Sequence, residues 1–290
     1  MTLSRLNVSH LRVLEKLRLH ASPGLNLITG LNGSGKTSIL EAIHMLATGR
    51  SFRTSRIEHM ISHGHRHLLV TGRIQRAEGP ELGMGILKSV GKTLARIDGR
   101  KVRSQSELAR LLPLQVIHPD SHELLTGPPS GRRSFMDWGL FYGEQAAVTA
   151  LGEYRRAHAQ RNEALRQGAA DAVLLPWERE MVRNAAILDT YRQTYLQSLR
   201  ELHAQMEGMW PDLRGLSWQY RRGWREGESL ETVMERGRAR ERELGYSLWG
   251  PHRAELLFSR HGESLAFSAS RGQQKLAVVA LRLLQVAAFH

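Results

Sequence analysis

The sequence has 290 residues, which is enough for a large hydrophobic core and more than one domain. Its 41 Lys and Arg against 28 Asp and Glu give a net charge of +13. Such an excess favours a polyanionic partner, most often nucleic acid, although a solvated basic surface is the alternative. The absence of cysteine excludes disulfides and thiolate metal sites and favours a reducing compartment.

The positive charge is unevenly distributed along the chain. Residues 1–150 hold 20 basic and 11 acidic side chains, a net charge of +9, whereas residues 151–245 hold 16 and 15, a net charge of +1. Residues 246–290 hold 5 basic and 2 acidic side chains. The N-terminus lacks the apolar core of a signal peptide, and no window approaches the roughly 20 apolar residues of a membrane span. We expect a cytoplasmic protein without a membrane partner.

Residues 3–29 carry the pattern of strands. Leu6 and Val8 alternate with polar neighbours, and Leu17 and Leu19 share one face before a turn at residues 22–24. The run at residues 25–29 (Leu-Asn-Leu-Ile-Thr) predicts a buried strand that leads into a glycine-rich loop. A β-rich start before such a loop is more typical of ATP-binding-cassette heads than of small kinases.

The glycine-rich loop fits the phosphate-binding pattern G-x-x-x-x-G-K-[ST]. It has the sequence Gly30-Leu31-Asn32-Gly33-Ser34-Gly35-Lys36-Thr37. Small residues let successive backbone N–H groups point at phosphate oxygens, and the following helix adds its dipole. Lys36 is then expected to reach the β- and γ-phosphates, where it acts as the catalytic cation, and Thr37 to ligate Mg²⁺. The pattern predicts binding of ATP or GTP, with a chance match in a glycine-rich turn as the alternative.

A helix is predicted directly after the loop. Ile39, Leu40, Ile43, Leu46 and Ala47 recur at helical spacing. Gly49, two residues after Ala47, stands where a C-terminal cap belongs.

The next segments predict loops and a meander of strands. Residues 48–53 are basic and predict a loop near the nucleotide. His63, His65 and His67 could share one face of a strand as metal ligands, but without a carboxylate or cysteine in the segment an exposed turn is favoured. Strands are predicted at residues 70–74, 82–87 and 95–100, with an Asp-Gly turn, and at 114–117.

Helix dominates from about residue 131 to residue 245. From Pro176 onward, apolar residues repeat at alternating spacings of four and three, with Arg192 where an apolar residue is due. These residues are Met181, Ala185, Leu188, Tyr195, Leu199, Leu202 and Met206. An earlier helix over residues 151–165 is expected to pack against this seam antiparallel, across a turn at 167–176. Either a projecting coil or an ordinary helical subdomain fits this pattern.

Two further stretches carry polar residues of interest. Arginines and aromatic residues mix at 216–224, which suits base stacking, but the alternation of Leu216, Trp218 and Tyr220 favours a buried strand face. At residues 268–275 a serine- and glycine-containing segment opens a predicted helix whose apolar stripe is expected at 276, 279, 280, 283, 284 and 287. Paired with the upstream loop, this helix start predicts a second phosphate contact.

Taken together, these motifs resemble the RecF family of recombination-mediator ATPases, within the ATP-binding-cassette and SMC-like superfamily. The resemblance covers the chain in order. It rests on residues 30–38, Gly-Arg-Ser-Phe-Arg at 49–53, Pro-Asp at 119–120, Gly-Pro at 127–128, Arg-Arg-x-Phe-x-Asp at 132–137, Gly-Pro-His-Arg at 250–253 and Ser-Arg-Gly-Gln-Gln-Lys at 270–275.

The resemblance implies an α/β fold, an ATP-binding-cassette head with an inserted helical domain. The head would comprise residues 1–130 and 246–290, and the insertion residues 131–245. It also implies an ATP-dependent homodimer that binds single-stranded and gapped DNA at single-strand/double-strand junctions and, with RecO and RecR, helps to load RecA. Ser270, Arg271, Gly272 and Gln273 would contact ATP held by the other subunit, and Arg50 and Arg53 would act near the phosphates.

The chain departs from this family pattern at one point. Such ATPases have an apolar strand that ends in paired acids after the signature helix, and the sequence has no such run before His290. We therefore expect a relative truncated before this strand, and ATP binding without turnover. An ATP-binding-cassette transporter subunit is the alternative function, and the long helical insertion and basic head argue against it. A P-loop kinase is a third, but kinases lack a Ser-x-Gly-Gln helix and have shorter lids.

Overall fold

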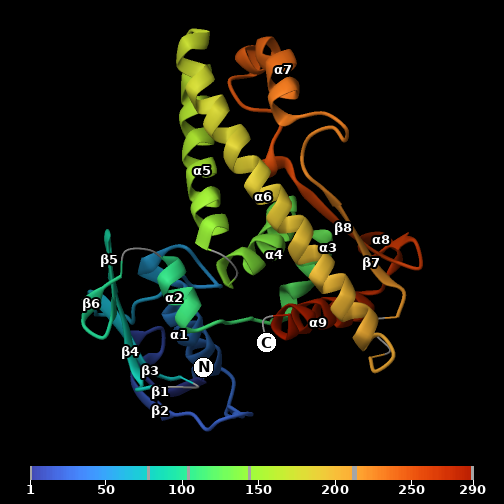
Figure 1. Cartoon of the computed structure of the whole chain (residues 1–290). Helices are drawn as coiled ribbons and strands as arrows, with labels where there is room; N and C mark the ends of the chain where they lie inside the picture. Colours follow the sequence, from blue (N-terminus) through green and yellow to red (C-terminus); the bar gives the residue numbers. More distant parts are fainter. Residues whose placement is uncertain (1, 77–78, 103–104, 143–144, 211–213, 289–290) are drawn as a thin grey trace. The chain divides into compact units, whose positions relative to one another are not determined.

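The structure is a computed structural model that describes residues 2–76, 79–102, 105–142, 145–210 and 214–288. It divides into two compact units, residues 1–116 and 117–290. Each unit is described separately below (Figure 1). The assignment of a head at 1–130 and 246–290 with an insertion at 131–245 stays a prediction.

The first unit is built on an antiparallel sheet of six strands in the order β2-β1-β3-β4-β5-β6. The strands are β1 (Thr2–Leu11), β2 (Leu14–His20), β3 (His67–Gln75), β4 (Leu82–Ser89), β5 (Lys92–Ile97) and β6 (Arg100–Lys101). The predicted meander is therefore confirmed, with the Asp-Gly turn between β5 and β6 in left-handed backbone at Asp98 and Gly99.

Helix α1 (Lys36–Thr48) packs on the sheet, and α2 (Gln105–Leu111) packs against α1. Leu6, Val8, Val70 and other alternating residues of the strands form one core with Met45 and Leu46 of α1. A Cβ on Gly72 of β3 would lie 2.5 Å from Leu46 Cδ2, so the missing side chain allows the helix to approach the sheet. The predicted cap is confirmed: Gly49 has φ 74° and donates its N–H to Met45 O at 2.7 Å.

Two predicted strands of this unit are wrong. Residues 25–29 and 114–117 have no strand conformation, and Leu25 and Leu27 are exposed by 94% and 84%. An apolar run becomes a strand only when a neighbouring strand completes its hydrogen bonds. No strand within the described residues pairs with either run. Leu40 of α1, predicted on the apolar stripe, is half exposed.

The second unit is mainly helical, as predicted, with a small antiparallel sheet of β7 (Leu216–Arg221), β8 (Glu255–Arg260) and β9 (Glu263–Ser264). Its helices are α3 (Glu123–Thr126), α4 (Pro129–Tyr142), α5 (Gln145–Arg166), α6 (Asp171–Met206), α7 (Leu230–Leu244), α8 (Leu265–Ser268) and α9 (Arg271–Ala287). Leu216 and Trp218 of β7 are buried, which confirms the interpretation of that stretch as a buried strand face. Within the described residues, no helix is long and apolar enough to cross a membrane.

Helices α5 and α6 lie side by side and antiparallel, as the heptad pattern predicts (Figure 1). The turn between them is shorter than expected, because α6 begins at Asp171 and includes Pro176. Proline at this position removes one hydrogen bond of the helix and brings its ring against the carbonyl of the residue four positions earlier. Arg192, the interruption of the seam, is 2% exposed and belongs to the core.

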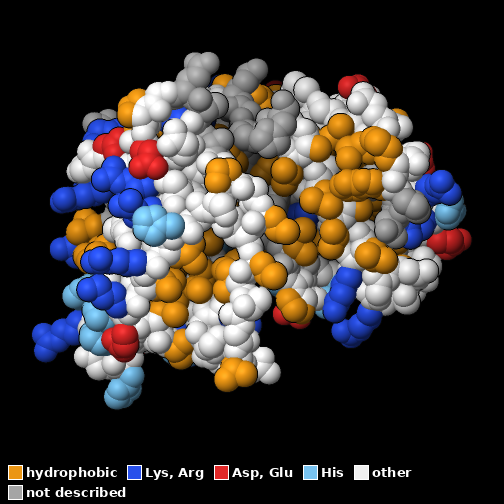
Figure 2. All heavy atoms as spheres, turned by 90° about the horizontal axis from the view of Figure 1, so that it is seen from below, with side chains coloured by type: hydrophobic (Ala, Val, Ile, Leu, Met, Phe, Trp, Pro, Cys, Tyr) orange, Lys and Arg blue, Asp and Glu red, His pale blue; other side chains and the backbone are white. Residues whose placement is uncertain are grey.

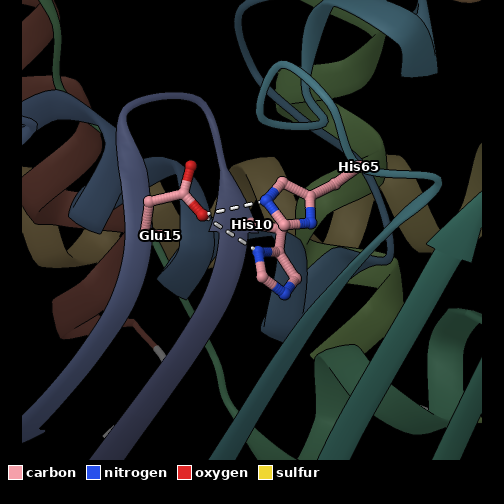
Figure 3. A group of neighbouring side chains, drawn as sticks. All are labelled: His10, Glu15 and His65. Atoms are coloured by element: carbon pink, nitrogen blue, oxygen red, sulfur yellow. Dashed lines mark hydrogen bonds and ion pairs between the residues drawn. The ribbon is translucent and has the colours of Figure 1, made fainter.

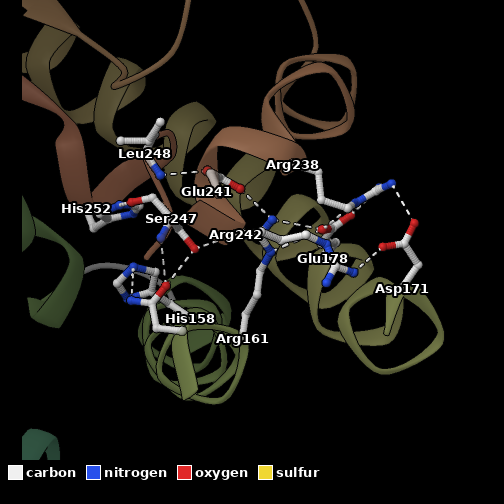
Figure 4. A network of polar contacts seen from close by, with 11 residues as sticks. His158, Arg161, Asp171, Glu178, Arg238, Glu241, Arg242, Ser247, Leu248 and His252 are labelled. Atoms are coloured by element: carbon white, nitrogen blue, oxygen red, sulfur yellow. Dashed lines mark hydrogen bonds and ion pairs between the residues drawn. The ribbon is translucent and has the colours of Figure 1, made fainter. Parts of the chain in front are cut away.

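A buried polar network joins α5, α6 and α7 (Figure 4). Arg161 of α5 is fully buried and donates to Glu178 of α6, to Glu241 of α7 and to Ser247. Arg238 binds the same Glu178 at 2.8 Å. Since the buried charges of this network are paired with one another, they tie three helices together without leaving an uncompensated charge.

Helix α9 forms as predicted, and its buried stripe includes the predicted Ala280 and Leu284 but is otherwise turned from the predicted one. Leu276 and Leu283 are 49% and 39% exposed, whereas Ala277, Val278 and Leu281 are buried. Two glutamines complete the buried face. Gln274 donates to Leu265 O at 3.2 Å, and Gln285 donates to Phe135 O at 2.9 Å. These hydrogen bonds require the glutamine side of the helix to face inward.

Candidate nucleotide site

The loop at residues 30–37 has the backbone of a phosphate cradle. It connects directly to α1, which begins at Lys36. Gly30, Gly33 and Gly35 have φ of 147°, 81° and 96°, conformations that other residues rarely adopt. The exposed part of the loop contains Leu31, Asn32, Gly33, Ser34 and Thr37.

Gly35 is required for a second reason, which is its contact with the turn of the β1–β2 hairpin. A Cβ at this position would lie 2.7 Å from Leu14 Cδ2 and 3.2 Å from Val13 Cγ2. The hairpin turn therefore supports the loop, and a side chain at position 35 would displace one or the other.

Lys36 folds back over the loop that precedes it. Its ammonium donates to the carbonyl oxygens of Gly30 and Leu31, both at 2.8 Å. The first N–H groups of a helix have no acceptor within the helix, so those of Lys36 and Thr37 are available to an anion at the start of α1. A cation, free N–H donors and a helix dipole thus converge on one exposed point, which is the chemistry that binds a phosphate chain.

Thr37 lies in the first turn of α1 and is exposed. Its hydroxyl is the group that the sequence assigns to Mg²⁺. A hydroxyl beside a phosphate can complete the oxygen ligands that Mg²⁺ prefers.

Sequence reasoning missed a pair of side chains that braces this helix. Arg12, in the β1–β2 turn, donates from Nε and Nη2 to the two carboxylate oxygens of Glu41 at 3.1 and 2.9 Å. Glu41 lies one turn after Thr37 and is fully buried. Ser51 also donates to Glu41, and Arg53 lies 3.4 Å from it. An acid among the mostly apolar residues 39–47 was the available signal.

The environment of Glu41 keeps it ionised. Burial alone would raise its pKa, but hydrogen bonds from Arg12 and Ser51 and the charges of Arg12 and Arg53 outweigh burial and hold the pKa below its usual value. The carboxylate therefore joins three segments at neutral pH: the hairpin turn, α1 and the loop after α1.

The two arginines predicted near the phosphates have different surroundings. Arg53 is 42% exposed at its side chain and contacts Glu41, whereas Arg50 is exposed and its carbonyl binds the His44 ring at 2.8 Å. Their action on phosphates stays a prediction.

The four predicted signature residues lie at the start of α9 in the second unit. Ser270 is the N-cap of the helix, and its Oγ accepts from Gln273 N at 3.3 Å. Gln273 Oε1 in turn accepts from Ser270 N at 2.8 Å, which completes a capping box. Arg271, Gly272 and Gln273 are exposed. The serine hydroxyl therefore has a structural role, and a contact with ATP is a further prediction.

Comparisons with known proteins show the family of the chain. The family model "RecF/RecN/SMC N terminal domain" matches residues 2–288. The DNA replication and repair protein RecF of Thioalkalivibrio sulfidiphilus is 43% identical over 286 residues, which cover 98% of this chain and 79% of that protein. RecF of Pseudomonas fluorescens is 40% identical over 287 residues, covering 98% and 78%.

Solved structures support the fold. A structure of the recombination mediator protein RecF-ATPrS in the RecFOR pathway matches with a TM-score of 0.88 at 24% identity, covering 99% of this chain and 81% of that one. A RecF-ATP structure matches with a TM-score of 0.89 at 23% identity. These matches confirm the predicted fold class, an α/β ATP-binding-cassette head with a helical region. The alternative of a transporter subunit is set aside, because the chain belongs to the RecF family of DNA replication and repair proteins.

Proposed function

We propose that this protein binds ATP with Mg²⁺ through residues 30–37 and uses the bound nucleotide to control its binding to DNA during repair. The observation that carries the proposal is the loop itself: left-handed glycines, the Lys36 ammonium and the free N–H groups of α1 meet at one exposed point. Lys36 would contact the β- and γ-phosphates, and Thr37 would ligate the metal ion. The related structures that carry ATP or ATPrS in their names support this choice of nucleotide.

The DNA contact is proposed on the outer face of the six-stranded sheet. Arg5 of β1 lies directly opposite Arg73 of β3 in the strand register, and both are exposed. Like charges opposite each other disfavour a sheet, so the pair needs another explanation. A phosphate backbone bound across the two strands would supply one.

Other basic residues extend the same face, which we call the basic sheet face. It comprises Arg5, Lys16, Arg18, His20, Arg73 and Arg96. Gly83 and Gly85 line the same groove as Arg73 and Arg96, and their lack of side chains leaves it open to a backbone. Lys and Arg side chains, with histidines among them, gather along the left edge of the view in Figure 2. A single-strand/double-strand junction or gapped DNA is the proposed ligand.

We further propose that ATP joins two copies of the chain, with Ser270 of one copy near the phosphates held by residues 30–37 of the other. The exposed start of α9, with its dipole and polar residues, supports this contact. The RecFOR pathway named for the related structure supports RecO and RecR as partners, and through them the loading of RecA at gaps.

The test measures ATP affinity of the purified protein with and without gapped duplex DNA. We expect the affinity to rise at least several-fold when DNA is present, since two ligands that favour the same state strengthen each other's binding reciprocally. Blunt duplex of equal length is the control for the DNA structure. Equal ATP affinities in all three conditions would contradict nucleotide control of DNA binding.

A further inference from the structure

Two histidines and a glutamate, far apart in sequence, meet at the end of the β1–β2 hairpin (Figure 3). His10 stands near the end of β1 with φ 57°, Glu15 follows the turn in β2, and His65 lies in the segment before β3. The sequence suggested a metal site from His63, His65 and His67. The structure brings only His65 into the cluster, and Glu15 supplies the carboxylate that was missing from that segment.

Both imidazoles direct a nitrogen at the same carboxylate oxygen. Glu15 Oε2 lies 3.0 Å from His65 Nε2 and 3.3 Å from His10 Nδ1. The two rings stack with centroids 3.7 Å apart and planes 18° from parallel, so one exposed ring has to turn out of the stack for both to bind one ion. All three ligand atoms lie within 4.8 Å of one another.

We propose that His10, Glu15 and His65 form a binding site for a divalent transition metal ion, best suited to Zn²⁺. Tetrahedral Zn²⁺ with bonds of about 2.0–2.1 Å places its ligand atoms about 3.3–3.4 Å apart. The two measured nitrogen–oxygen separations already lie close to this value. Two imidazoles and one carboxylate are a ligand set that Zn²⁺ takes in proteins, with the fourth position left for water.

The site is open to an ion from solvent. The side chains of Glu15 and His65 are 65% and 36% exposed, and that of His10 is 29% exposed. Lys16 and Arg66 are the sequence neighbours of two ligands, so their charge opposes cation binding and favours an affinity below that of a closed structural site. His67 approaches His10 edge-on, with centroids 6.1 Å apart, and lies outside the ligand set.

A bound ion would fix the hairpin turn relative to the segment before β3. The same turn carries Arg12, which binds Glu41 of α1, and Leu14, which packs on Gly35. The metal would therefore stiffen the support of the phosphate loop without touching the nucleotide.

The test is a titration of metal-free protein with Zn²⁺ by calorimetry and with Co²⁺ by visible absorption. We expect one equivalent to bind more tightly than the background from the remaining histidines, and Co²⁺ to give the strong absorption of a tetrahedral site. His65→Ala should weaken this equivalent at least tenfold, and Glu15→Gln should weaken it similarly. His63→Ala is the matched control, since His63 lies in the same segment but outside the cluster.

Circular dichroism melting of each metal-free variant shows whether it is folded. His65 lies on the surface, so His65→Ala remains informative even if His10→Ala fails to fold. Equal Zn²⁺ affinity in wild type, His65→Ala and Glu15→Gln would overturn the proposal. A Co²⁺ spectrum of octahedral intensity would also overturn the proposal, because the proposed site is tetrahedral, with three protein ligands and one water.

Discussion

The guanidinium of Arg192 donates from Nε and Nη2 to a single oxygen of Asp137, at 3.1 and 2.7 Å. Both side chains are buried, and Arg192 also donates to Pro251 O at 3.1 Å. The pair links α6 to α4 and to the segment before β8. Arg192, which interrupts the apolar pattern of α6, thus connects three segments of the second unit through its hydrogen bonds.

Asp137→Ala is expected to destabilise the second unit by about 3–5 kcal/mol, because it leaves a buried guanidinium without its carboxylate. The measurement is urea unfolding followed by tryptophan fluorescence. All six tryptophans lie after residue 117, so this signal reports the second unit alone.

The matched control is the double variant Asp137→Leu with Arg192→Met, which replaces the pair by apolar groups of similar size. We expect it to recover most of the stability that Asp137→Ala removes, since it eliminates both buried charges. If Asp137→Ala unfolds at the wild-type urea concentration, the pair does not hold these elements together.

The free energy of unfolding of the second unit is expected to decrease as the pH is lowered from 6.5. Burial, with the positive charges of His158 and Arg253, lowers the pKa of His252 to about 3. Its Nδ1 faces the Tyr154 hydroxyl at 2.7 Å and its Nε2 faces Ser247 O at 3.1 Å, contacts that suit a neutral ring. Between pH 6.5 and 3 the unfolded chain binds this proton and the folded chain does not, so stability falls as pH falls.

One histidine of this kind changes the free energy of unfolding by about 1.4 kcal/mol per pH unit. His252→Gln should reduce the slope measured between pH 6.5 and 5 by tryptophan fluorescence in urea. His122→Gln is the control, because His122 belongs to the same unit and is only partly buried. An unchanged slope in His252→Gln would show that the folded protein accepts this proton freely.

Regular elements could be predicted from the sequence wherever the decisive pattern is local. The alternation of Leu6 and Val8 specifies a strand face, and the spacing of Met181, Ala185 and Leu188 specifies a helix seam. Residues 25–29 show the limit of this reasoning, because an apolar run does not reveal whether a partner strand lies beside it. In α9, apolar residues occupy several sides, so hydrophobicity alone could not choose the buried stripe.

The site could be predicted in part for the same reason. The loop at 30–37 carries its chemistry in consecutive residues, so its geometry follows from the motif. The side chains that support the loop could not be predicted in this way, because Arg12 and Glu41 are 29 residues apart and meet only in the folded chain. The sequence singles out His65 as one of three closely spaced histidines. The residues beside it in the fold, His10 and Glu15, come from the β1–β2 hairpin and could not be predicted from that spacing.

Ser270 gives a prediction that separates a structural cap from a contact with nucleotide. Ser270→Ala should cost about 1 kcal/mol through loss of the cap, whereas Ser270→Asp should retain most of that stability. Ser270→Arg should abolish ATP-driven dimers in sedimentation while ATP still binds the monomer. Dimers that persist in Ser270→Arg would leave the serine with only its capping role.

DNA binding should depend strongly on salt and on the basic sheet face. The double variant Arg5→Ala with Arg73→Ala should lower the slope of log K against log[salt] by about 0.7–0.9 for each DNA phosphate that these arginines neutralise in the wild type. The matched control pairs Arg179→Ala with Arg240→Ala, two exposed arginines of the near-neutral region 151–245. Equal slopes in the two double variants would place the DNA-binding surface elsewhere.

The central claim, that residues 30–37 hold the phosphates of ATP, is tested most directly by titrating a fluorescent ATP analogue into wild type and Lys36→Ala. The Lys36 ammonium donates to carbonyl oxygens of its own loop at a partly exposed position, so its removal should leave the melting temperature nearly unchanged. Lys92→Ala, at an exposed strand position, is the control. We predict that affinity falls at least a hundredfold in Lys36→Ala and stays at the wild-type value in Lys92→Ala. Equal affinity in wild type and Lys36→Ala would contradict the assignment of this loop to ATP.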